Sequence, residues 1–355
     1  MYRPRGIPTR RRAPRLVALL AALALADTAG AAERPGHHAA ERVVSVYSAR
    51  HYRSDEALYA AFTVRTGIRV NRVDGKEDEL LEQLRSEGAS GPADVFITVD
   101  AARIGHADAL GLFQPLHSRV LASRIPARLR TSRWAAFSTR ARVIVYAKGA
   151  VDPALIRNYE DLAAPALKGK VCARSGLHPY NLSLGAALLA HLGEARTEEW
   201  ARGVVANLAR PPRGTDGDQL RALVAGECQV ALANTYYVAR LMRSHRADDR
   251  EAAAKLGVVW PDQQSFGAHV NVSAGGILRS ARHPAEALAF LEYLASDEAQ
   301  AHFAEGNEWP AVRTVRVRNA ILDGFGPFKA DPLDVEALTR NTLATWKIFE
   351  RAGWR

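Results

Sequence analysis

The sequence predicts an α/β protein with two lobes, in which mixed sheets flanked by helices meet at a hinged cleft. Short apolar runs alternate with amphipathic helical segments through the first third of the chain. Residues 152–261 then form a block with its own pattern, and 270–278 would return the chain to the first part. Roughly 320 residues follow an N-terminal targeting segment, which is more than one typical core needs. We therefore expect one lobe from residues 43–140 and 270–355 and a second from 141–269.

Strands and helices are expected to alternate through the first third of the chain. The expected strands are residues 43–47, 68–73 and 95–99. The expected helices are 55–66, 77–85 and one that begins at residue 101. Gly67, Gly88 and Gly111 follow these helices and are typical helix stops. Repetition of this kind predicts a mostly parallel sheet in this part.

The second block and the return segment follow a loose, arginine-rich connection. The block's expected elements are a strand at 143–147, a strand at 170–173, helices at 183–192, 198–208 and 218–225, and a strand at 229–233. Asn234 or Thr235 can cap a helix after that last strand. The return strand at 270–278 contains Gly275-Gly276, and an amphipathic helix begins at Pro284.

Residues 1–31 have the features of a signal peptide. Six arginines precede the apolar run 16–26, and Ala29-Gly30-Ala31 suits signal peptidase. The run is too short to span a bilayer as a mature helix. Its removal takes half of the formal net charge of +10 and leaves no basic run with interleaved aromatic residues. We therefore expect an exported, periplasmic protein that does not bind nucleic acid.

Cys172 and Cys228 are the only cysteines in the sequence. An even count in an exported protein favours a disulfide, because the periplasm keeps thiols oxidised. Two buried free thiols are the alternative. Each cysteine lies at or beside an expected strand and precedes a tyrosine by eight residues, so a bridge would join those two strands.

Tyrosines follow three of the expected strands. The three motifs are Arg50-His51-Tyr52, His178-Pro179-Tyr180-Asn181 and Asn234-Thr235-Tyr236-Tyr237. A phenolic oxygen is a hard donor that becomes anionic when it loses its proton, and a highly charged cation favours that loss. Core packing or helix capping would explain each tyrosine singly. Their shared position beyond strand ends, where α/β proteins place ligands, points to a metal site.

These motifs resemble the iron contacts of the tyrosine-rich class of periplasmic ferric-ion-binding proteins, the receptors of ABC iron importers. The resemblance runs from about residue 43 to the end and implies a type II-like periplasmic-binding-protein fold. It implies that Fe(III) is bound by a set of five residues, without requiring a synergistic carbonate or phosphate. The set is His51, Tyr52, Tyr180, Tyr236 and Tyr237. It also implies delivery of iron to an ABC permease in the inner membrane, and we expect the receptor to be a monomer.

The chemistry of this donor set agrees with the resemblance. Four phenolates and one imidazole favour Fe(III) over Fe(II) and disfavour Cu(I). Four phenolates around a trivalent ion leave a net negative site, so nearby arginines should support it. Arg50, Arg103 and Arg174 are close enough in sequence to do so, although a plain surface position is the more common one for such an arginine.

Two other classes of function fit parts of the sequence. A receptor of the same fold could bind an organic solute or an oxyanion, with the tyrosines stacking on the ligand. An exported metal-dependent hydrolase is the enzyme alternative. Catalytic metal sites keep an open coordination position, and five protein ligands leave little room for one. No nucleophile-and-base motif occurs either, so we expect that the protein is not an enzyme.

Overall fold

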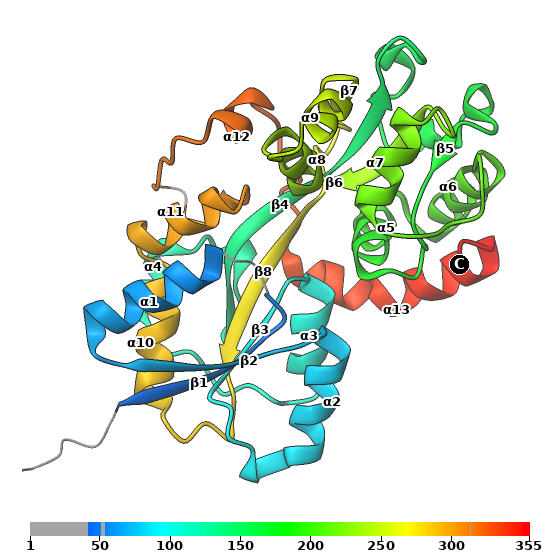
Figure 1. The fold of residues 1–355 in the computed structure, drawn as a ribbon. Helices are drawn as coiled ribbons and strands as arrows, with labels where there is room; N and C mark the ends of the chain where they lie inside the picture. Colours follow the sequence, from blue (N-terminus) through cyan, green and yellow to red (C-terminus); the bar gives the residue numbers. More distant parts are fainter. Residues whose placement is uncertain (1–41, 51–53, 313) are drawn as a thin grey trace, which may run out of the picture. The chain divides into compact units, whose positions relative to one another are not determined.

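The framework of the protein is a mixed β-sheet, seen in a computed structural model that describes residues 42–50, 54–312 and 314–355 (Figure 1). The strands are β1 (Val43–Ser48), β2 (Arg69–Asp74), β3 (Val95–Thr98), β4 (Trp134–Ala147), β5 (Val171–Cys172), β6 (Val230–Asn234), β7 (Leu256–Val259), β8 (Val270–Ile277) and β9 (Trp309–Pro310). Within the described residues their order is β2-β1-β3-β8-β4-β6-β5, with β7 and β9 paired to β4. β1 runs parallel to β2 and β3, whereas β8 and β4 run antiparallel to their neighbours. The expected α/β class with a mixed sheet is thus confirmed.

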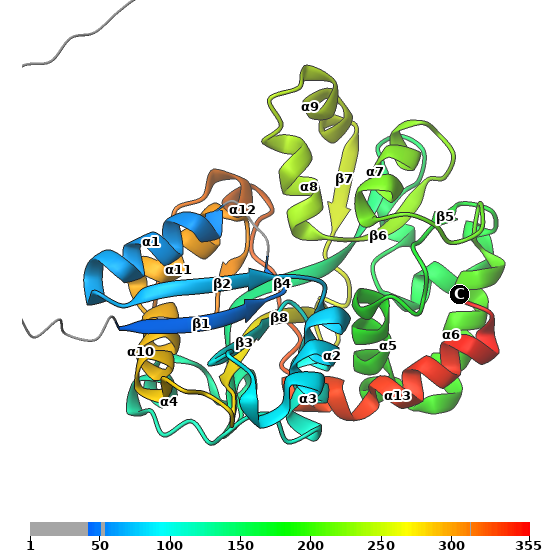
Figure 2. The same ribbon diagram turned by 60° about the horizontal axis from the view of Figure 1, so that its bottom comes forward.

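Helices cover this sheet, and most of them match the sequence-based expectations to within a turn. They are α1 (Ser54–Thr66), α2 (Glu77–Glu87), α3 (Ala101–Ala109), α4 (Arg119–Arg124), α5 (Pro179–Leu192), α6 (Glu194–Ala206), α7 (Asp216–Val224), α8 (Thr235–Met242), α9 (Ala247–Ala254), α10 (Pro284–Leu294), α11 (Asp297–Glu305), α12 (Ala320–Gly324) and α13 (Val335–Ala352). Figure 2 shows α1 and α10 together on one side of β1 to β3 and α2 and α3 on the other. Phe62 of α1 packs edge-on against Phe290 of α10, with ring centroids 5.1 Å apart.

The long strand β4 corrects one expectation. The predicted loose connection before residue 143 is the first half of this strand, which pairs with β8 from Trp134 to Ala141. From Arg142 onward the same strand pairs with β6. The arginines that suggested an exposed connection, Arg140 and Arg142, are buried and donate hydrogen bonds to interior partners. A guanidinium with satisfied donors can be buried, and composition alone does not reveal those partners.

The second half of β4 separates two hydrophobic clusters. Ile144 packs on one face with Trp200 and Phe349, and Val143 and Val145 pack on the other face. This alternation follows from the two-residue period of a strand. Burying an aliphatic side chain of this size stabilises the fold by about 1.5–3 kcal/mol. A further cluster surrounds β1, β3, β8 and α10.

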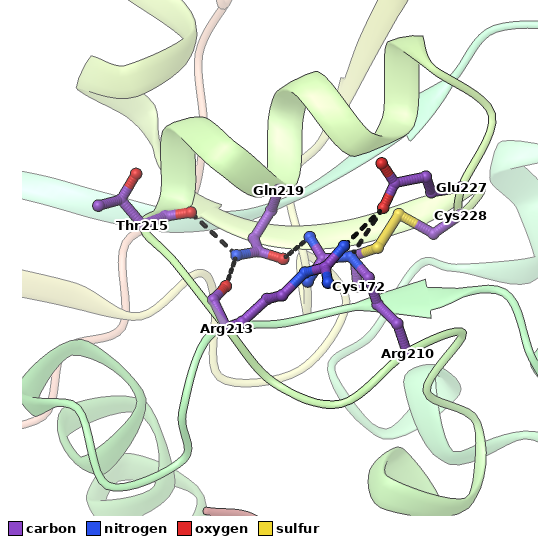
Figure 3. Close-up of a disulfide and its surroundings, with 7 residues drawn as sticks. All are labelled: Cys172, Arg210, Arg213, Thr215, Gln219, Glu227 and Cys228. Atoms are coloured by element: carbon purple, nitrogen blue, oxygen red, sulfur yellow. Dashed lines mark hydrogen bonds and ion pairs between the residues drawn. A yellow bond between two sulfur atoms is a disulfide. The ribbon is translucent and has the colours of Figure 1, made fainter.

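A disulfide joins Cys172 of β5 to Cys228 just before β6, as predicted, with Cα atoms 5.8 Å apart (Figure 3). The two strands that it connects are parallel neighbours in the sheet. Loop entropy in the unfolded chain gives such a bridge about 4 kcal/mol of stabilisation. Beside it, Gln219 of α7 donates to the backbone oxygens of Arg213 and Thr215, at 2.6 and 2.9 Å. These bonds fix the chain that leads from the disulfide region into α7.

The helix α13 packs against α3, α5 and α6 (Figure 1). Trp354, two residues beyond its C-terminal end, is fully buried. The indole of Trp354 donates to the backbone oxygen of Arg174 at 3.1 Å. Gly176 lies against the same indole, and a Cβ there would come within 2.5 Å of it. The loop before α5 is therefore held by a residue 180 positions later in the chain.

Two expectations stand outside these observations. The signal peptide at 1–31 lies outside the described residues. The division into lobes at residues 43–140 with 270–355 and at 141–269 stays a prediction. Among the described residues, none of the helices combines the length and apolar character that a membrane crossing requires.

Candidate metal centre

Three of the five predicted iron ligands come together at the first turns of two helices. Tyr180 lies in the first turn of α5, and Tyr236 and Tyr237 lie in the first turn of α8, directly after β6. The Tyr236 hydroxyl donates to the Tyr180 hydroxyl across 3.0 Å. The rings of Tyr236 and Tyr237 are stacked, with centroids 4.6 Å apart. All three tyrosines thus stand at helix N-termini, where backbone N–H groups make the helix end partly positive.

Local sequence explains why each tyrosine stands where it does. Pro179 occupies the first turn of α5, where its missing N–H is not needed. His178 is the N-cap, and its Nδ1 accepts from the backbone N–H of Tyr180 at 3.2 Å. Burial lowers the pKa of His178 to about 3, and the charges of Arg174 and Arg142 add to that effect, so its imidazole is neutral.

The cap of α8 is placed as predicted but does not act through its side chain. Asn234 is the N-cap residue, yet its side chain makes no capping hydrogen bond. Its Oδ1 instead accepts from the guanidinium of Arg142 at 2.9 Å. The residue that begins the tyrosine helix is thus tied to the sheet beneath it.

The other two predicted ligands, His51 and Tyr52, lie outside the described residues. They follow Arg50, which is described and buried at the end of β1. Their participation in the site stays a prediction.

The three arginines proposed as supporting residues lie in different surroundings. Arg174 is mostly buried, and its guanidinium lies 5.2 Å from the centre of the Tyr180 ring. Arg50 pairs with Asp55 at 3.0 Å and with Glu308 at 2.7 Å. Arg103 pairs with Asp78 at 2.6 Å. Of the three, Arg174 is the one that contacts a described tyrosine, and the roles of Arg50 and Arg103 in the site stay predictions.

Two further residues at the tyrosines were missed from sequence. Arg240 of α8 places its guanidinium 4.9 Å from the Tyr236 ring and 5.5 Å from the Tyr237 ring. Its spacing, four and three residues after the tyrosines, was a usable signal, because such residues share a helix face. Arg142 contacts the segments that carry all three tyrosines, but no local pattern marks it, because its partners are distant in sequence.

The donor chemistry of this place suits a hard, highly charged cation. Among the described residues there is no cluster of three or more His, Cys, Asp or Glu that could hold a metal ion. A metal at this place would therefore rely on phenolic oxygens. The guanidinium groups of Arg174 and Arg240 lie over the tyrosine rings and bring positive charge to this place. Ferric iron has the charge and hardness that such donors prefer.

Comparisons with known proteins agree on one family. The sequence profile of the bacterial extracellular solute-binding proteins matches residues 48–301. Iron uptake protein A1 of Synechocystis sp. is 42% identical over 340 residues, covering 95% of this chain and 93% of that protein. The Fe(3+)-binding periplasmic protein of Serratia marcescens is 30% identical and covers 88% of this chain and 91% of that protein.

Solved structures give the same result. The Trichodesmium protein IdiA (FutA), in complex with iron and citrate, has a TM-score of 0.85 and 45% identity, over 88% of this chain and 100% of that one. The ferric binding protein of Campylobacter jejuni has a TM-score of 0.84 and 37% identity, over the same shares of the two chains. The chain therefore belongs to the bacterial extracellular solute-binding proteins, and its relatives there are iron uptake and ferric iron-binding proteins.

Proposed function

We propose that this protein is an exported receptor that captures Fe(III) as its cargo and delivers it to an ABC permease in the inner membrane. The observation that carries the proposal is the hydroxyl pair of Tyr180 and Tyr236, 3.0 Å apart, with Tyr237 stacked beside it. Two phenols at this distance need little movement to bind one cation. The iron-binding relatives support the choice of metal.

In this proposal His51 and Tyr52 complete the shell from the segment after β1. Iron would then connect the end of β1 with the first turns of α5 and α8. A ligand that binds one conformation more tightly shifts the population toward it, so loading with iron would favour a closed state. The receptor would act as a periplasmic monomer, and it would perform no catalytic step.

The test is the colour of the iron complex. Fe(III) supplied as ferric citrate to the metal-free protein should give a visible phenolate-to-iron charge-transfer band. Tyr236→Phe and Tyr237→Phe should each shift this band and weaken iron binding by roughly 10-fold or more, since one anionic ligand is lost while the ring remains.

Tyr293→Phe is the matched control. Tyr293 of α10 is about as buried as Tyr236, and its hydroxyl has no hydrogen-bond partner among the described residues. Its loss should leave the band and the affinity unchanged. The proposal would be refuted if the wild-type protein showed no visible band. It would also be refuted if Tyr236→Phe and Tyr237→Phe both bound iron as tightly as the wild type.

One observation favours the alternative of an anionic solute. Arg174 and Arg240 lie over the tyrosine rings, and two guanidinium groups with phenolic donors can also bind a carboxylate or an oxyanion. Calorimetry with citrate in the absence of iron separates the two functions. Tight citrate binding, together with no colour on addition of iron, would favour this alternative.

A further inference from the structure

The guanidinium of Arg142 is buried beneath the three tyrosines and binds three separate segments of the chain. Its Nε and Nη2 donate to Asn181 Oδ1 at 3.0 and 2.7 Å. Its Nη1 donates to Asp216 Oδ2 at 3.0 Å and to Asn234 Oδ1 at 2.9 Å. Arg142 is 1% exposed, and Asp216 and Asn181 are fully buried.

The first of these acceptors, Asn181, stands next to a tyrosine in sequence. Asn181 directly follows Tyr180, and its Nδ2 donates to the backbone oxygens of Arg174 and Ser175 at 3.1 and 2.9 Å. The loop before α5 and the first turn of α5 are thus fixed through one side chain. The contact with Arg142 places that side chain relative to β4.

The other acceptors fix the start of α8. Asn234 precedes Tyr236 by two residues, and its backbone N–H donates to Asp216 Oδ2 at 2.9 Å. Asp216 therefore receives both the guanidinium of Arg142 and the N-cap amide of the tyrosine helix. Its second oxygen accepts from Arg174 at 3.4 Å, which connects the same carboxylate to the residue over the Tyr180 ring.

We propose that Arg142 is a positioning residue for iron binding, because one rigid guanidinium sets the placement of Tyr180 relative to Tyr236 and Tyr237. The inference rests on the proposed function. A metal site tolerates ligand displacements of only about 0.5 Å, so the mutual placement of two helix ends matters directly. The planar fork of arginine can contact all three acceptors at fixed angles, whereas the single ammonium of lysine cannot.

A purely structural role is the competing explanation. A buried ion pair is weak evidence for stability, since a well-packed apolar group of similar volume often stabilises as well. What an apolar group cannot do is hold Asn181 and Asn234 at set distances from each other. The two explanations therefore predict different results for a substitution that retains the charge.

The test compares Arg142→Lys with Arg130→Lys. Arg130 is a half-buried arginine whose guanidinium donates to the backbone oxygens of Ile125 at 3.0 Å and Ala122 at 3.2 Å. Each protein is titrated with ferric citrate, with competition by citrate to obtain the affinity. Arg142→Lys should weaken iron binding by roughly 10–100-fold, the range seen when a residue that orients metal ligands is lost. It should also shift the visible band, whereas Arg130→Lys should keep the wild-type band and affinity.

Asn234→Ser is the second variant, in case Arg142→Lys fails to fold. Serine is a good N-cap residue, so α8 should persist, but its side chain is too short to reach Arg142. Iron binding should fall by roughly 10-fold and the band should shift.

The outcomes are distinguishable. A wild-type band that stays unchanged in Arg142→Lys and Asn234→Ser would overturn the positioning role alone. An equal loss in Arg130→Lys would overturn it too, because the loss would then not depend on contact with the tyrosine segments. A wild-type protein that shows no band at all would instead refute the proposed iron receptor.

Discussion

Two buried arginine clusters lie along β4, and they differ in charge. The cluster beneath the tyrosines sets two arginines, Arg142 and Arg174, against one carboxylate, Asp216. The other cluster, at the end of β1, sets Arg50 and Arg140 against Asp55 and Glu308. The positive charge is therefore in excess beneath Tyr180, Tyr236 and Tyr237, and it is balanced at the other cluster. In the proposed site the excess charge would offset part of the negative charge of the bound phenolates, whereas the balanced cluster serves the stability of the fold.

Glu308→Ala should disrupt the balanced cluster and have the largest effect on the free energy of unfolding. The Glu308 carboxylate accepts from Arg50 at 2.7 Å and from Ser138 at 2.8 Å, and it is 1% exposed. Burial alone would raise its pKa, but Arg50 and Arg140 reverse this and hold the pKa below its ordinary value. Its removal takes one of the two carboxylates from a buried cluster of two guanidinium groups, so the free energy of unfolding should fall by roughly 3–5 kcal/mol.

Denaturant unfolding of the metal-free protein measures this change. Glu305→Ala, three residues earlier and largely exposed, is the control and should change stability by no more than about 0.5 kcal/mol. A loss below about 1 kcal/mol in Glu308→Ala would show that the cluster does not stabilise the fold.

Replacing both cysteines with serine should lower the stability of the fold through β5 and β6, the strands that precede the tyrosine segments. The bridge joins β5, which leads to Tyr180, to the start of β6, which leads to Tyr236. The double variant should lose about 2–4 kcal/mol of unfolding free energy. Chemical denaturation of the oxidised wild type and of the variant gives the difference. Equal midpoints would show that strand pairing alone holds β5 and β6 together.

His269 is close to both clusters, and its effect on stability is small at neutral pH and grows as the pH falls. Burial lowers its pKa to about 3, and the charges of Arg142 and Arg140, one from each cluster, add to this. The unfolded chain has the ordinary histidine pKa of about 6.5. Below that pH the unfolded chain binds a proton that the folded chain excludes, so acidification lowers stability.

The slope from His269 should be about 1.4 kcal/mol per pH unit between roughly pH 6 and pH 4. Unfolding free energies of the wild type and of His269→Gln, measured over this range, isolate the contribution, because other titrating groups cancel in the difference. Parallel stability curves would mean that His269 titrates normally in the folded protein.

The sequence predicted the elements whose signals are local. The strand at 229–233 and the helix after Asn234 are found at β6 and α8, so the tyrosine pair was placed at a strand-to-helix turn as expected. The first half of β4 was not predicted, because Arg140 and Arg142 resemble exposed residues until their distant partners are known.

In the site, too, features with local sequence signals were predicted and features that depend on distant partners were not. Tyr180 and Tyr236 were expected to share a site, and the structure brings their hydroxyls together. The contact of Arg142 with Asn181 and Asn234 spans 39 and 92 positions, which no spacing rule covers. Arg240 could have been found from its helical spacing to both tyrosines. The assignment of His51 and Tyr52 as ligands rests on the sequence motif alone.

The bond from the Trp354 indole to the loop before α5 bears on when the site can form during synthesis. Contacts across so long a stretch of chain form late and slowly, because the intervening segment must first be ordered. A chain still emerging from the ribosome lacks Trp354 until α13 has been made, and Gly176 then has no indole to pack against. The loop before α5 thus gains this support only after α13 has been added.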